Sequence, residues 1–240
     1  MKRNALLRIY SSRKHLAATF GIIILPFLFF IFFARLTEIR TEDLFLDIGI
    51  SFIRLIAAYC ISVVLAWILA VLFYKGGRGA VALPIFDVLQ SFPTFAALPI
   101  GVYFFGSSNA VIIFFLVLTI VWPILFSIIS SLKLIKRDWE EAVEIFGLSG
   151  FQYMTKFLLP VSIPGLVTGT IIGLGEGWEA LIATEIIVRA PVGLGSFFGA
   201  FSHDPAITAF GILGFLLLVF SINKLIWLPL LEWSHERMEE

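Results

Sequence analysis

Polar and charged side chains lie within long apolar stretches of this sequence. A charged group in apolar surroundings is costly, and in a membrane such groups by default mark a solute or ion pathway. Such side chains can bind a polar solute and let it move on unchanged. They therefore indicate transport. The candidates for lining a polar passage are Arg54, Gln90, Ser91, Glu176, Trp178, Glu179 and Glu185.

Ion pairing within the protein is the alternative role for these charges. Arg54 can pair with one of the glutamates in 176–185, and Lys224 can pair with Asp87. Three carboxylates along one segment disfavour an anionic solute unless they are protonated or paired. A neutral or cationic solute is therefore an alternative to an anion.

Catalytic and metal-binding patterns are absent from the sequence. Cys60 is the single cysteine, and the three histidines, His15, His203 and His235, are far apart. The sequence contains no GxxxxGK[ST] phosphate loop, no HExxH and no GxSxG. We therefore expect no enzyme, no metal site, no cofactor and no ATP-binding motif in this chain.

The composition indicates a membrane protein. Hydrophobic residues make up 60% of the chain and charged residues 14%, against about 25% charged in a typical soluble domain. Long uncharged apolar runs predict membrane-spanning helices, so the expected fold class is an all-α integral membrane protein with six transmembrane helices. The expected spans are 16–36, 47–74, 81–105, 109–132, 163–188 and 207–231. Pro84, Pro93 and Pro99 interrupt the third span, either as simple kinks or as a break where a solute meets freed carbonyls.

The distribution of basic residues predicts the orientation. Residues 1–15 are basic, and the first span lacks a convincing cleavage site, so it is expected to be retained as an anchor. With the N-terminus in the cytoplasm, twelve of the 17 Lys and Arg residues fall in inner segments and three in outer loops. Both termini, including the tail 236–240, are therefore predicted to be cytoplasmic.

A polar segment, about 136–161, separates the fourth and fifth spans. Its pattern predicts a helix–turn–helix with an apolar ridge and an acidic face formed by Glu140, Glu141 and Glu144. Such a helix can lie on lipid headgroups, but an acidic face is repelled by an anionic inner leaflet. The segment fits better as a docking surface for a soluble protein.

Four glycines recur at every fourth position of the fifth span. Gly165, Gly169, Gly173 and Gly177 therefore fall close to one helical face. A stripe of small residues lets two helices approach closely. Helix packing is the expected role, and a smooth wall along a passage is the alternative.

The polar segment resembles the "EAA" loop of permease subunits of binding-protein-dependent ABC importers. The matching residues are Glu141, Ala142, Gly147, Leu159 and Pro160. "LPIFDVLQSFPTFAALPIGVYFFG" (83–106), "GLGEGWEALIATEII" (173–187) and "GLGSFF" (193–198) are similar to the nitrate, sulfonate and taurine branch of that family. Glu185 matches a glutamate that this branch often has, whereas Glu176 departs from the residues expected there.

The resemblance covers residues 45–235 and implies a type I importer permease core of five transmembrane helices. It also implies a separate ATPase that docks on the loop through Glu141, Ala142 and Gly147, and a substrate-binding protein outside the prokaryotic plasma membrane. A second permease copy, most simply an identical one, would complete the pathway for a small solute. A gradient-driven secondary transporter is the alternative function, although it would not need an ATPase-docking loop.

Overall fold

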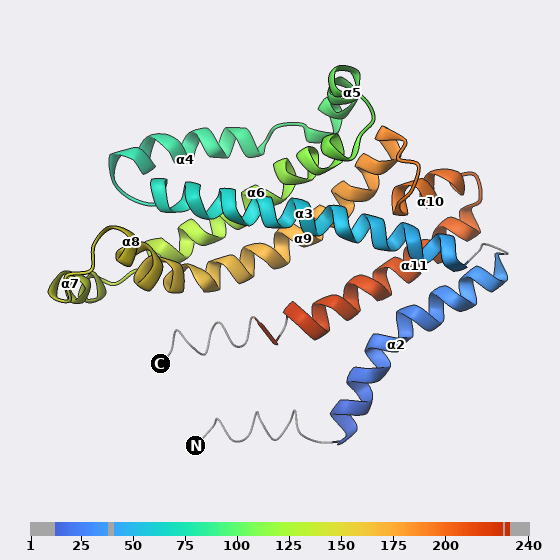
Figure 1. Cartoon of the computed structure of the whole chain (residues 1–240), viewed down its shortest axis with the longest axis horizontal. Coiled ribbons are helices and arrows are strands. Elements are labelled where there is room, and N and C mark those ends of the chain that lie inside the picture. Colours follow the sequence, from blue (N-terminus) through green and yellow to red (C-terminus); the bar gives the residue numbers. More distant parts are fainter. Residues whose placement is uncertain (1–12, 38–40, 228, 231–240) are drawn as a thin grey trace.

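Helices form all the regular structure in the part of the chain described by the computed structural model, residues 13–37, 41–227 and 229–230 (Figure 1). The elements in chain order are α2 (Arg13–Leu36), α3 (Thr41–Phe73), α4 (Gly76–Gln90), α5 (Thr94–Phe105), α6 (Asn109–Lys133), α7 (Arg137–Ile145), α8 (Gly150–Tyr153), the π-helix η1 (Met154–Leu158), α9 (Leu159–Val188), α10 (Leu194–Ala200), α11 (Pro205–Ile222) and the π-helix η2 (Asn223–Trp227).

The described residues contain four helices long and apolar enough to cross a membrane. They are Glu42–Phe73, Asn109–Lys133, Gly150–Val188 and Pro205–Ile226, and the bent pair α4 and α5 can form a fifth crossing. The first expected span, 16–36, falls within α2, where the described apolar stretch is the shorter Ile24–Leu36. The all-helical membrane class is confirmed, whereas the count of six stays a prediction.

The third expected span, 81–105, is a pair of helices that meet at an angle of 79°. α4 ends at Gln90 and α5 begins at Thr94, immediately after Pro93. Proline lacks a backbone N–H and disfavours helical geometry in the residue before it, which explains a break at this position. Pro84 and Pro99 lie inside α4 and α5, so of the three prolines only Pro93 marks the break.

α6 lies at the centre of the bundle, between α3 and α9. Ser108 caps its first turn by accepting a hydrogen bond from the Val111 amide. Large side chains such as Ile120 and Ile124 are fully buried along its length. Because α6 is covered on several faces, it forms the core on which the other helices pack.

The four-glycine stripe of α9 faces α6. A methyl group added at Gly165 would lie 2.3 Å from the Ser127 carbonyl oxygen, and one at Gly169 would lie 2.6 Å from Ile124 Cα. Gly173 and Gly177 approach the same helix, with nearest α6 atoms at 3.2 and 2.8 Å. The two backbones are therefore too close for any side chain at the first two positions.

Two opposite ends of the bundle carry the non-spanning helices (Figure 1). α7 and α8 lie at one end, here called the α7 end, and α10 lies at the other, the α10 end. α3 runs between the two ends, and its 33 residues correspond to about 50 Å at 1.5 Å per residue. A single helix thus connects both ends of the molecule.

Candidate functional site

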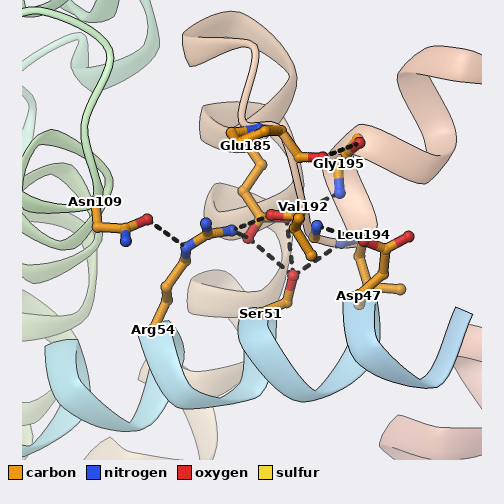
Figure 2. A network of polar contacts seen from close by, with 11 residues as sticks. Asp47, Ser51, Arg54, Asn109, Glu185, Val192, Leu194 and Gly195 are labelled. Atoms are coloured by element: carbon orange, nitrogen blue, oxygen red, sulfur yellow. Dashed lines mark hydrogen bonds and ion pairs between the residues drawn. The ribbon is translucent and has the colours of Figure 1, made fainter. Parts of the chain in front are cut away.

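A buried ion pair joins Arg54 of α3 to Glu185 of α9 near the α10 end (Figure 2). Glu185 has no exposed surface, and Arg54 is only 6% exposed. Arg54 Nη1 donates to Glu185 Oε1, and Ser51 Oγ, one turn earlier on α3, lies 2.8 and 2.9 Å from the two carboxylate oxygens. The pairing of Arg54 with a glutamate of the fifth span, which was one of two alternatives, is therefore present.

Backbone amides at the start of α10 complete the coordination of these side chains. The Gly195 amide donates to Glu185 Oε2 at 2.8 Å, and the Leu194 amide donates to Ser51 Oγ at 2.8 Å. The Gly193 amide donates to Asp47 Oδ1 at 2.7 Å. The segment after α9 is thereby tied to α3 through three consecutive amides.

Gly193 cannot carry a side chain in this arrangement. Its φ is +142°, and an added methyl group would lie 2.6 Å from both carboxylate oxygens of Glu185 and 2.7 Å from Arg54 Nη1. Glycine is the residue that tolerates this backbone geometry and leaves this space free.

The remaining donors of Arg54 reach two further segments. Arg54 Nε donates to Asn109 Oδ1 of α6 at 3.0 Å, and Nη1 donates to the Val192 carbonyl at 2.7 Å. We call Asp47, Ser51, Arg54, Asn109, Glu185 and the 192–195 backbone the Arg54–Glu185 cluster. It links α3, α6, α9 and α10, and its central charges are paired and hydrogen-bonded, as buried charges must be.

A cavity of about 820 Å³ opens at the break between α4 and α5. Its other walls come from the middle of α6 and the middle of α9. The volume falls in the range of small-molecule sites. The lining residues are Asp87, Gln90, Phe92, Pro93, Thr94, Phe95, Ala96, Leu118, Thr119, Trp122, Pro123, Phe126, Ser127, Ile172 and Glu176.

The sequence candidates for a polar passage separate into groups in the structure. Gln90 and Glu176 line the cavity. Trp178 is buried in the core, where its ring packs against Phe52 and Phe215. Arg54 and Glu185 form the cluster, while Ser91 and Glu179 are exposed and do not line the cavity.

Asp87 lies on α4 and Lys224 lies on the π-helix η2. Asp87 Oδ1 accepts a hydrogen bond from Gln90 Nε2 at 2.6 Å and faces the cavity. Among the ion pairs of the described residues, none joins Asp87 to Lys224. That expected pairing is therefore wrong.

The α7 end presents a group of exposed apolar side chains. Ile145, Phe146 and Phe151 are 83%, 78% and 79% exposed, and they flank the turn between α7 and α8. Gly147 in this turn has a φ of +64°, which favours glycine. Glu141 lies on α7 and pairs with Arg137 at 3.0 Å.

Two contacts hold the α7–α8 segment against the end of α3. Lys75 Nζ lies 2.8 Å from Glu140 Oε1, and the hydrogen bond raises the pKa of Lys75 above its usual value. The hydroxyl groups of Tyr74 and Tyr153 lie 3.2 Å apart. Both contacts connect residues distant in sequence, so the segment is attached to the bundle at more than its chain ends.

Sequence reasoning missed Ser51, Asn109 and Gly193. Ser51 lies between Asp47 and Arg54 at helical spacing, so the three positions share one face of α3, and that spacing was the available signal. Nothing in the sequence near Asn109 or Gly193 indicates contact with Arg54, since these residues meet through tertiary packing.

The chain matches the family of binding-protein-dependent transport system inner membrane components over residues 62–226. It is 32% identical to the nitrate import permease protein of Leptolyngbya laminosa over 157 residues, which cover 65% of this chain and 56% of that protein. It is 32% identical over 114 residues to the bicarbonate transport system permease protein of Synechococcus elongatus, covering 48% and 41% of the two chains. The taurine transport system permease protein of Escherichia coli is 34% identical over 112 residues, covering 47% and 40%.

The matched region is a part of each relative. The chain spans about half the length of the curated relatives that it matches, between 40% and 56% of the three named here.

Proposed function

Because this chain belongs to the binding-protein-dependent transport system inner membrane components, we propose that it is the permease subunit of an ATP-driven importer for a small solute. The proposed partners are a separate ATPase on the cytoplasmic side, a substrate-binding protein on the outer side, and a second permease copy. The relatives are named for the import or transport of nitrate, bicarbonate and taurine, and a small polar solute is the class that these names share.

The α7–α8 turn carries the proposal. An exposed apolar group flanked by carboxylates suits a protein partner better than a membrane surface, because anionic headgroups repel carboxylates. Ile145, Phe146 and Phe151 offer the apolar contact, and Glu141 lies on the adjoining helix α7. We therefore assign residues 136–161 as the coupling loop, with Glu141, Ala142, Gly147, Leu159 and Pro160 as its coupling residues.

The loop is attached at both of its ends to spanning helices. α8 continues through η1 into α9, so Gly150–Val188 is one helical unit of 39 residues. The Lys75–Glu140 and Tyr74–Tyr153 contacts bind the loop to α3. A movement imposed on α7 by an ATPase would thus be passed to α3 and α9, which carry the Arg54–Glu185 cluster at the other end.

The pathway is proposed to follow the cavity at the α4–α5 break, with Gln90 and Glu176 on its walls. Glu176 lies mid-way along α9 and is exposed in the single chain. A carboxylate at that depth cannot face lipid without a large cost. It therefore faces an aqueous passage, which a second copy would close.

Purification of the tagged chain from its native membrane, with identification of bound proteins by mass, tests the coupling role. An ATPase near a one-to-one ratio is expected. In Glu141→Lys its recovery should fall about tenfold or more, because a misplaced charge in an interface costs a few kcal/mol.

Arg137→Ala is the matched control. It removes the same exposed ion pair and keeps the Glu141 carboxylate, and such pairs contribute little. ATPase recovery should stay at the level of the unmodified chain. A chain that comes out alone even after cross-linking would contradict the proposal and favour a gradient-driven transporter.

A further inference from the structure

We propose that the cavity at the α4–α5 break selects a solute that carries a positively charged nitrogen on an apolar or aromatic body. This inference rests on the proposed transport function and names the class of solute that the function would act on. It excludes a bare inorganic anion, such as those for which two of the relatives are named.

The charged residues of the cavity all have one sign. Asp87 and Glu176 line it from α4 and α9, and no Lys, Arg or His is among the described residues of its wall. Arg54, a basic residue of the spanning helices, belongs to the cluster at the α10 end and is already paired with Glu185. An anion in the cavity would therefore meet two carboxylates and no compensating charge.

A second copy of this chain would not change that balance. A copy facing the passage brings its own Asp87 and Glu176 and, again, no basic residue from the cavity wall. Pairing of identical subunits thus doubles the acidic groups. In a passage formed by two identical copies, the excess of carboxylates would therefore remain.

Aromatic rings make up much of the remaining wall. Trp122 and Phe126 lie on α6, and Phe92 and Phe95 lie on either side of Pro93. The face of an aromatic ring attracts a cation, and tryptophan does so most strongly. Carboxylates together with aromatic faces form a site suited to an organic ammonium or a protonated heterocycle.

The position in the fold agrees with a solute site. Glu176 lies near the middle of α9, and Trp122 lies near the middle of α6. The remaining wall of the cavity is formed by α4 and α5, which together make an interrupted helix. In transporters, interrupted helices near the membrane midplane are where solutes and ions are bound.

Reaction of a cysteine in the cavity with reagents of opposite charge tests the proposal. The reporter is Ser127→Cys in a Cys60→Ala background, in the full chain, in membranes opened so that both faces are accessible. The probes are the cationic trimethylammonium-ethyl and the anionic sulfonato-ethyl methanethiosulfonate, and the rates are compared with those for Ser202→Cys, which is exposed outside the cavity.

The cationic reagent should be favoured at Ser127→Cys by about tenfold or more over its preference at Ser202→Cys, because a cleft lined by one sign of charge concentrates counter-ions to this extent. Asp87→Asn combined with Glu176→Gln should abolish the excess at the cavity cysteine and leave the control unchanged. Thr94→Cys, also on the cavity wall, is the second reporter.

Protection by candidate solutes gives an independent readout. Benzyltrimethylammonium should slow the modification of Ser127→Cys, and nitrate should not. Protection by nitrate alone, or by neither probe, overturns the proposal, as does an equal charge preference at cavity and control cysteines. Two reporters that react with neither reagent also overturn it, because the cavity would then not be water-filled.

Neither measurement needs the ATPase. A failure here together with a bound ATPase in the purification would reject the solute class and leave the importer assignment in place. A cation-selective cavity in a chain that binds no ATPase would reject the importer assignment and leave the solute class in place.

Discussion

Glu185 shows how one residue can organise an end of the molecule. Its carboxylate accepts hydrogen bonds from Ser51 Oγ, Arg54 Nη1 and the Gly195 amide while having no exposed surface. A buried carboxylate is costly unless its charge and lone pairs are satisfied. The donors that satisfy the carboxylate come from α3 and from the start of α10. This side chain therefore specifies the positions of both segments.

Glu185→Gln is expected to destabilise the chain by about 3–5 kcal/mol, because it leaves the Arg54 charge buried without its partner. Glu176→Gln is the matched control, an exposed carboxylate on the same helix, and should change stability by about 0.5 kcal/mol or less. Thermal unfolding of the detergent-purified variants measures both. Equal midpoints for the two variants would contradict the role of Glu185 in positioning α3 and the start of α10.

At the scale of elements, the contact between α6 and α9 depends on missing side chains. The glycine stripe brings the α9 backbone against the Ser127 and Ile124 backbone atoms of α6. In a membrane, where lipid is as apolar as the side chains, such close packing is what holds helices together. Since α9 also carries the α8 extension, this interface joins the α7 end to the bundle core.

Gly165→Ala should lower stability by about 1–3 kcal/mol, since the added methyl group overlaps the Ser127 carbonyl oxygen and the helices must separate. Gly175→Ala on the same helix has no atom within 4 Å of its added methyl group. It should be neutral or stabilising by up to about 1 kcal/mol, because alanine favours helix more than glycine does. Resistance to thermal aggregation in detergent distinguishes them, and a Gly165→Ala variant as stable as Gly175→Ala would rule out the close contact.

At the scale of the whole molecule, two ends with different surfaces are connected by long helices. The α7 end exposes apolar and acidic side chains, and the α10 end contains a satisfied polar cluster. α3 and the unit Gly150–Val188 each run between them. The proposed coupling to an ATPase requires such a continuous connection between the two ends.

The positive-inside rule predicts which end faces the cytoplasm, and this orientation gives a labelling prediction. In a Cys60→Ala background, Ser149→Cys at the α7 end should react with a membrane-impermeant thiol reagent only from the cytoplasmic side. Ser202→Cys, between α10 and α11, should react only from the outer side. Both positions are exposed, so accessibility within the chain does not limit either reaction. The reverse pattern would invert the topology.

Local patterns were sufficient to predict much of the fold. The run 109–132 nearly coincides with α6, because more than twenty predominantly apolar residues without a charge are typical of a membrane-spanning helix. Gly147, with its positive φ, lies in the turn expected after α7. The prediction of the third span was less accurate. Three prolines are visible in the sequence, but whether each one kinks or breaks the helix depends on the residues packed around it.

The sequence by itself determined the membrane class, the spans that are long and unbroken, and the family, because apolar run length and motif spacing are properties of the chain alone. Tertiary structure alone decided which charges meet. Arg54 pairs with Glu185, 131 residues away, whereas Lys224 does not pair with Asp87. Trp178 packs in the core, while Glu176, two residues earlier, faces the cavity. The helical repeat sets the angle between successive side chains around the helix axis. Only the neighbouring helices decide which side chains face a partner residue, a passage or lipid.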